Sequence, residues 1–265
     1  MKNACIISPI HEPKFSFGKS FVESYSKFYD DDDIFLIFSS EIESAKFANI
    51  CDLNYQSIII PIDNPNAYGT ITKKKFLGLK YIFDNTFFEN VGVVDVDTIF
   101  TTKKDYAKLF EEYNERAKIF CNYSHADLIK NVIKDPIRLF DSDQKDKLNS
   151  LISDNVYFWF NDIPIYHKKH FKSFWQFIEK RFVEIGGNDY DFILYGYYLI
   201  ANDIYNLEFF EFNNHKIECG FSLLEEQIYI DKSTFDIAFN QANPMWIKNN
   251  IDDMKNVFMK VHTDR

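Results

Sequence analysis

Glycine and proline are scarce in this chain, with 8 and 7 residues among 265, and no long apolar run is present. The scarcity of both residues leaves little room for long flexible linkers, so we expect one domain spanning residues 1–265. No stretch approaches the roughly 18 consecutive apolar residues of a membrane-spanning helix. The N-terminus lacks the basic segment and apolar run of a secretory signal. These absences predict a soluble protein, located in the cytoplasm or at the inner face of the membrane.

Cysteine and net positive charge are also lacking. The four cysteines stand far apart and form no CxxC pair, which argues against a disulfide framework or a zinc site and favours buried free thiols. The formal net charge of −10 argues against a general nucleic-acid binder, because phosphate contacts need a basic face. It leaves room for a local basic site that binds a phosphorylated small molecule.

Aromatic residues are abundant instead, with 29 Phe and 16 Tyr, and apolar residues make up 46% of the chain. That content is enough for a sizeable core. In the first half, apolar runs alternate with helical stripes, and the expected order is strand 4–10, helix 18–29, strand 33–40, helix 40–50, strand 57–62, helix 70–88 and strand 91–97. Such a series predicts βαβ units and a Rossmann-like α/β fold, with a mostly parallel sheet flanked by helices.

The second half is less regular. Its expected extended segments are 117–124 and 155–167, and its expected helices are 168–182, 190–203 and a C-terminal stripe from Ile247 to Val261. The polar segment 127–150 is expected to be a surface excursion or a mobile loop. The helix at 168–182 combines a ring-rich side with lysines, which allows either contact with an anionic membrane or packing on the sheet.

The most informative motif is "NVGVVDVDTIF", residues 90–100, in which Asp95 and Asp97 end an expected buried strand. Two carboxylates at such a place are costly unless their charge is compensated. Mg²⁺ and Mn²⁺ prefer oxygen ligands and usually take one or two carboxylates plus substrate phosphates. An Asp-x-Asp alone is common by chance, and a capping or turn role is the alternative. The preceding βαβ series and the lysines Lys73–Lys75 favour a metal site.

The strand and loop "IISPIH", the lysine-bearing helix and "VGVVDVDTIF" together resemble the nucleotide-binding half of the GT-A glycosyltransferases, over roughly residues 3–125. The resemblance implies a GT-A-like fold with a nucleotide-binding half (1–125) and an acceptor-side half (126–265). It implies sugar transfer from a nucleotide diphosphate sugar, with UDP-sugar favoured, to a glycan or lipid-linked acceptor hydroxyl. Mn²⁺ or Mg²⁺ would be the cofactor, and assembly of bacterial surface polysaccharide or lipooligosaccharide the setting.

Several site residues follow from the same resemblance. Asp97 would ligate the metal directly, and Asp95 would contact the metal through water or the ribose. The other expected nucleotide contacts are Ser8, Pro9, Ile10, His11 and Lys73.

The stretch "GGNDYDFILYGYYL" resembles the acidic turn that opens a helix in some retaining members of this family. Asp189 and Asp191 would then hold the donor sugar, or act as base in an inverting enzyme, the alternative being a helix N-cap. Retaining members often supply a C-terminal His as third metal ligand. Here "NPMWIKNN" has none, and His262 is the assigned candidate, with His215 as the other late histidine.

Two further functions stay open. HAD-type phosphatases use a similar Asp-x-Asp at a strand end, with the first Asp as nucleophile, but Ile99 occupies the place of their Thr or Val. A non-catalytic scaffold that keeps the fold for binding is the third interpretation.

Overall fold

The computed structural model of the chain describes residues 3–29, 33–62, 69–100, 103, 105–123, 127–152, 156–157, 164–209, 216–218, 229–231 and 260–262. A five-stranded sheet in the order β3-β2-β1-β4-β8 forms its centre. The strands are β1 (Ala4–Pro9), β2 (Ile34–Phe38), β3 (Gln56–Ile59), β4 (Asn90–Val93) and β8 (Ile165–His167). The first four run parallel and β8 is antiparallel to β4, which confirms the expected mostly parallel α/β sheet.

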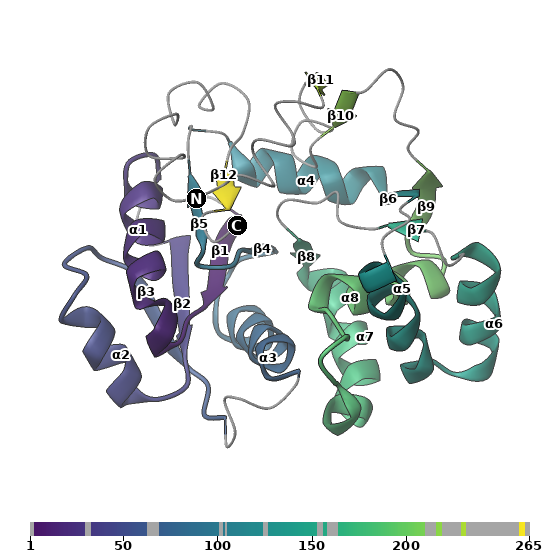
Figure 1. The fold of residues 1–265 in the computed structure, drawn as a ribbon, viewed down its shortest axis with the longest axis horizontal. Helices are drawn as coiled ribbons and strands as arrows, with labels where there is room; N and C mark the ends of the chain where they lie inside the picture. The colour runs from purple at the N-terminus through teal and green to yellow at the C-terminus, as the bar shows by residue number, and fades with distance from the viewer. Residues whose placement is uncertain are drawn as a thin grey trace.

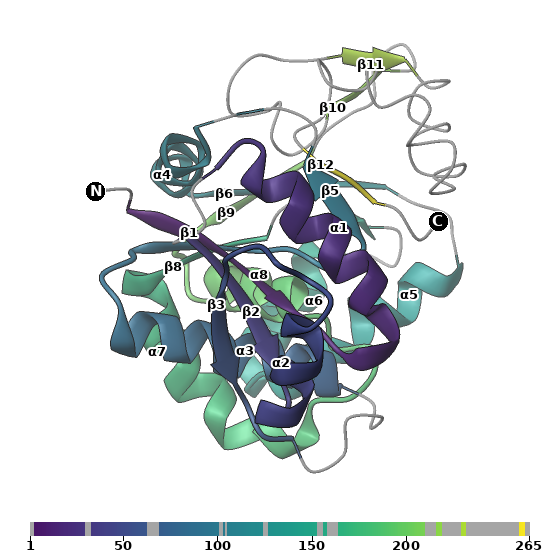
Figure 2. The same cartoon turned by 90° about the vertical axis from the view of Figure 1, so that its left-hand side faces the viewer.

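Helices flank this sheet on both faces (Figure 2). Helices α1 (Phe15–Ser26) and α4 (Tyr106–Arg116) lie on one face, where the hydroxyls of Tyr25 and Tyr106 are 3.0 Å apart. Helix α3 (Thr70–Asn85) lies on the other face together with α7 (Lys168–Ile178) and α8 (Asp191–Ala201). Rings from α3 and α7 pack edge to face, as between Phe76 and Phe174 at 5.1 Å. Both faces of the parallel strands are therefore buried, as their continuous apolar sequences require.

Local signals explain where two of the helices begin. Ser40 caps α2 (Glu41–Ala48) by accepting a hydrogen bond from the Glu43 backbone N–H, as its sequence pattern predicts. Before α3, Gly69 has φ +79°, and a Cβ there would lie 2.6 Å from the Ile185 carbonyl oxygen. Only glycine suits both the left-handed backbone and the close approach of the 185 segment.

The remaining strands form smaller sheets (Figure 1). Strand β6 (Lys118–Tyr123) pairs in parallel with β9 (Asn206–Phe209) and antiparallel with β7 (Val156–Tyr157). The other pairs are β5 (Thr98–Phe100) with β12 (Lys260–His262), and β10 (Lys216–Glu218) with β11 (Tyr229–Asp231). Figure 1 shows β1, β2 and α1 to α3 on one side and α5 to α8 on the other, with β4 and β8 between them.

The prediction of a loop over 127–150 is wrong. The chain there forms α5 (Asp127–Lys134), a 3-10 turn η3 (Asp135–Leu139) and α6 (Ser142–Leu151). Asp141 and Gln144 form a reciprocal capping box at the start of α6. A few buried apolar side chains then anchor this polar stretch to the core, namely Ile133, Ile137, Leu139, Phe140 and Leu148.

The predicted C-terminal helix is also corrected at its end. Val261 lies in strand β12 opposite Ile99, because residues 260–262 pair with β5. The rest of that predicted helix, 247–259, lies outside the described residues. Likewise, 158–163 of the predicted extended segment is not described.

For the helix at 168–182, packing on the sheet layer is confirmed. Its ring-bearing side is buried against α3 and α8 through Phe171, Phe174 and Ile178, and a 3-10 turn η4 (Glu179–Glu184) follows. These rings are not available to a membrane, and contact through the exposed Lys169 and Lys172 stays a prediction. None of the described helices combines the length and apolar character needed to cross a membrane.

Candidate active site

The carboxyl ends of β1 and β4 lie side by side at the point where the strand order reverses. The chain proceeds from β1 to β2 and β3 on one side and only then to β4 on the other. In open α/β sheets such a reversal leaves a crevice in which ligands bind. Ser8 near the end of β1 donates a hydrogen bond to the Val94 carbonyl, which ties the two strand ends together. The segments 8–11 and 95–97 therefore meet where the sequence predicts a site.

Lysines compensate the charges of both carboxylates of the Asp-Val-Asp motif. Lys75 Nζ on α3 lies 3.0 Å from Asp95 Oδ1. Lys14 Nζ, in the 3-10 turn η1 (Glu12–Lys14), lies 3.5 Å from Asp97 Oδ2. The Asp95 side chain is 48% exposed and that of Asp97 17% exposed. The motif thus offers two partly exposed carboxylates, each paired with a lysine.

Lys75 also contacts the second half of the molecule. Its Nζ lies 3.1 Å from Asp191 Oδ1, and the Tyr166 hydroxyl donates to Asp191 Oδ2 at 2.6 Å. Burial lowers the pKa of Lys75, but Asp191 and Asp95 outweigh burial and hold this pKa above its ordinary value. Burial, reinforced by Asp191, raises the pKa of the Tyr166 hydroxyl. Asp191 is thus joined to the motif through one buried ammonium group.

A second buried lysine supports the loop after β1. Lys74 Nζ donates to the Ile10 carbonyl at 2.6 Å and to Ser39 Oγ at 3.0 Å. Burial lowers the pKa of Lys74 to about 8, against an opposing effect of Glu43. Because Ser8 and Ile10 are completely buried and Pro9 is buried, these three residues can shape the site only from beneath.

Two polar atoms at this end of the sheet are buried and have no hydrogen-bond partner among the described residues. They are Nδ1 of His11 and Oγ1 of Thr98, the residue after Asp97. Burial, followed by Lys74, lowers the pKa of His11. Buried polar atoms in folded proteins are nearly always paired, so these two atoms are candidates to contact a ligand.

The structure does not connect two of the predicted site residues to this group. Asp189 is 1% exposed, and Arg138 binds both of its carboxylate oxygens, with the Gly186 N–H as a further donor. This bidentate pair braces the turn before α8, which disfavours a catalytic role for Asp189. Lys73 is half-buried in the first turn of α3, and no described contact joins it to Asp95 or Asp97.

The sequence analysis named Lys73–Lys75 together but assigned only Lys73 to the site, whereas the structure places Lys75 beside Asp95. The signal was present, because Lys75, Leu79 and Ile82 share the i, i+4, i+7 spacing of the buried stripe of α3. A buried lysine requires a counter-charge, and Asp95 after the end of β4 provides one.

A metal fits this site only in part. Among the described residues, no group of three or more His, Cys, Asp and Glu side chains is arranged to hold an ion. Asp95 and Asp97 are two oxygen donors that Mg²⁺ or Mn²⁺ accepts when ligand phosphates complete the coordination. The backbone of His262 pairs with that of Thr98, the residue directly after Asp97. The predicted third ligand therefore lies on the strand opposite the end of the motif.

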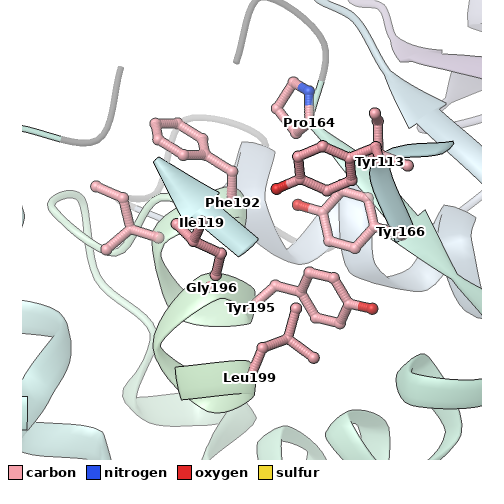
Figure 3. A pocket seen from close by; sticks show the side chains of 10 residues that line it. Tyr113, Ile119, Pro164, Tyr166, Phe192, Tyr195, Gly196 and Leu199 are labelled. Atoms are coloured by element: carbon pink, nitrogen blue, oxygen red, sulfur yellow. The ribbon is translucent and has the colours of Figure 1, made fainter. Parts of the chain in front are cut away.

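A small cavity lies beside Tyr166, along α8 from Phe192 to Leu199 (Figure 3). Its volume of about 30 Å³ suffices for one or two water molecules but not for a sugar. The rings of Tyr113, Tyr166 and Tyr195 line it together with Phe192. At this volume it is not a donor pocket.

No protein-family model matches the chain, and no curated protein matches it. Among solved structures, it is similar to the crystal structure of mannose-1-phosphate geranyltransferase from Thermus thermophilus. The identity is 11% and the TM-score 0.31, and the match covers 46% of this chain and 41% of that one. The chain thus spans less than half of that enzyme's length, and at these values the likeness supports no conclusion about activity.

Proposed function

We propose that the protein transfers a sugar from a nucleotide diphosphate sugar to an acceptor hydroxyl, with Mn²⁺ or Mg²⁺ as cofactor. The observation that carries the proposal is the position of Asp95 and Asp97. Both leave the sheet at the end of β4, beside the end of β1, where the strand order reverses. Lys14 and Lys75 pair with these carboxylates, and a bound divalent cation would add the positive charge that an anionic diphosphate needs.

The roles of the chain's own residues follow from their exposure and contacts. Asp97 would ligate the cation, with Asp95 as second carboxylate and His262 as candidate third ligand. When bound, the cation would neutralise the charge that develops on the departing diphosphate. Lys14 has a side chain 30% exposed and can turn from Asp97 toward a phosphate oxygen. His11 Nδ1 and Thr98 Oγ1 offer polar contacts to the nucleotide at the rear of the site.

Asp191 would face the sugar side of the site. It is fixed by Lys75 and Tyr166 at the start of α8, within one ion pair of Asp95. Both aspartates are 1% exposed, and what favours Asp191 is its link to Asp95 through Lys75, whereas Asp189 is bound by Arg138. A UDP-sugar donor, a glycan or lipid-linked acceptor, and a role in surface polysaccharide assembly belong to the same proposal.

Replacement of Asp97 tests the assignment. We expect Asp97→Asn and Asp97→Ala to weaken Mn²⁺-dependent binding of the nucleoside diphosphate at least about 10-fold, because a carboxylate ligand is lost. Titration calorimetry measures this binding, and thermal unfolding should change little because the Lys14–Asp97 pair is partly exposed.

The matched control is Asp84→Asn, which removes a carboxylate paired with Lys80 on the outer side of α3. It should bind nucleotide as the unaltered protein does. Unchanged Mn²⁺-dependent binding in both Asp97 variants would contradict the metal assignment.

A further inference from the structure

The ammonium group of Lys75 is shared between carboxylates from the two halves of the molecule. Its side chain is 9% exposed and lies 3.0 Å from Asp95 and 3.1 Å from Asp191. Asp95 follows β4 of the central sheet, whereas Asp191 opens α8 of the second half. One buried cation therefore fixes the two acidic groups relative to each other.

The two partners of Lys75 differ in their freedom to move. Asp191 is 1% exposed, and its other oxygen accepts a hydrogen bond from Tyr166. Asp95 is 48% exposed and can turn outward. If Asp95 leaves, Lys75 keeps Asp191 as counter-charge, so the buried ammonium group is never left unpaired.

We propose that Lys75 is a positioning residue that competes with the divalent cation for Asp95, an inference that rests on the proposed function. Lys75 does not reach the ligand in this arrangement, since its Nζ is enclosed by the two carboxylates. It holds Asp95 in place before the cation binds and releases it when the cation binds. When the cation binds, Asp95 exchanges its ion pair with Lys75 for the cation. Asp191 keeps its ion pair with Lys75.

The competition gives Lys75 a signature that a merely structural residue lacks. A positive charge 3.0 Å from a ligand oxygen opposes binding of a second cation there. Removing that charge should therefore tighten binding of Mn²⁺ to the nucleotide-free protein. The same change should lower transfer activity, because Asp95 and Asp191 lose their common anchor. Loss of a structural support would instead weaken Mn²⁺ binding or leave it unchanged.

The experiment measures Mn²⁺ binding without nucleotide, from the electron paramagnetic resonance signal of free Mn²⁺. We expect Lys75→Met to bind Mn²⁺ about 3- to 10-fold more tightly than the unaltered protein. Lys75→Arg, which keeps the charge, should stay close to the unaltered protein. Lys80→Met, on the exposed side of the same helix, is the matched control and should show no change.

Lys75→Met leaves Asp191 buried without its cation and can fail to fold. The double variant Lys75→Met/Asp191→Asn removes both charges together, and Tyr166 can still donate to the amide oxygen. It should also bind Mn²⁺ more tightly, and its thermal unfolding shows that the fold is kept.

The outcomes separate the two proposals. If a nucleoside diphosphate binds with Mn²⁺ but the double variant binds Mn²⁺ alone no more tightly than the unaltered protein does, or neither binds Mn²⁺ alone, the competition at Asp95 is overturned while the proposed function stands. If the unaltered protein binds neither Mn²⁺ nor any nucleoside diphosphate in the presence of Mn²⁺, both proposals are overturned.

Discussion

Among the described residues, the four least exposed charged ones are Lys74, Lys75, Asp189 and Asp191, and each is held by defined partners. Lys75 and Asp191 neutralise each other at 3.1 Å, and Asp189 forms a two-pronged pair with Arg138. Burial of an ion costs several kcal/mol unless an opposite charge and hydrogen bonds replace its water. At these positions the buried residue is stabilised by its polar and charged partners and not by packing alone.

The histidine pair at the start of α7 gives a prediction on pH. Burial, followed by His167 and Lys169, lowers the pKa of His170 to about 4. The unfolded chain, with a His pKa of about 6.5, then binds more protons than the folded one between these values. Stability from this residue is present above about pH 6.5 and is lost as the pH falls toward about 4.

Replacement by a residue that does not titrate tests this. We expect the unfolding free energy of His170→Gln to fall less on acidification than that of the unaltered protein. The difference should be about 1–2 kcal/mol, reduced from the full linkage value because the ring is partly exposed. Urea unfolding between pH 4 and pH 7.5 measures it. If the unfolding free energies of both proteins change with pH in parallel, His170 is not the titrating group.

At the scale of elements, helix α3 is held unusually close to the sheet. A Cβ on Gly78 would lie 2.2 Å from Ile37 Cδ1 of β2 and 3.7 Å from Ile7 Cδ1 of β1. This close approach lets Lys74 reach the end of β1 and Lys75 reach the end of β4. The packing of one helix thus sets the position of the charges in the site.

Gly78→Ala tests the role of this contact. Alanine favours a helix by about 1 kcal/mol over glycine, whereas overpacking a core costs about 1–3 kcal/mol. We expect the overpacking cost to exceed the gain in helix propensity, with a net loss of up to about 2 kcal/mol in urea unfolding. Ile37→Val removes the nearest atom, so the double variant should be less destabilised than the sum of the single ones.

Gly196→Ala in α8 is the matched control, because its Cβ would meet Ile119 Cδ1 at an easier 3.3 Å. It should be close to neutral. Stabilisation by Gly78→Ala alone would mean that α3 can move away from the sheet at no cost.

Elements were predictable where a local pattern decides them. Ser40 and Glu43 mark the start of α2, and the β-branched runs mark β1 to β3. The helices of 127–150 were missed because polar residues dominate their exposed sides and only a few apolar ones reach the core. The Asp141–Gln144 capping box was the overlooked signal.

At the scale of the whole molecule, long-range pairing limits what sequence can predict. Strand β6 pairs with β9 although Lys118 and Asn206 are far apart in the chain, and no local pattern encodes that partner. In the site, too, local features were predictable and long-range contacts were not. The position of Asp95 and Asp97 at a strand end follows from a local pattern, whereas the Lys75–Asp191 pair depends on the packing of α8 beside α3.

The central claim is that the carboxyl ends of β1 and β4 bind a nucleoside diphosphate through a divalent cation. The most direct measurement is calorimetric titration of UDP, GDP, CDP and dTDP into the protein, each with and without Mn²⁺. The account predicts that at least one of them binds, UDP first, and only when Mn²⁺ is present. Absence of binding for all four, or binding that is indifferent to Mn²⁺, would contradict it.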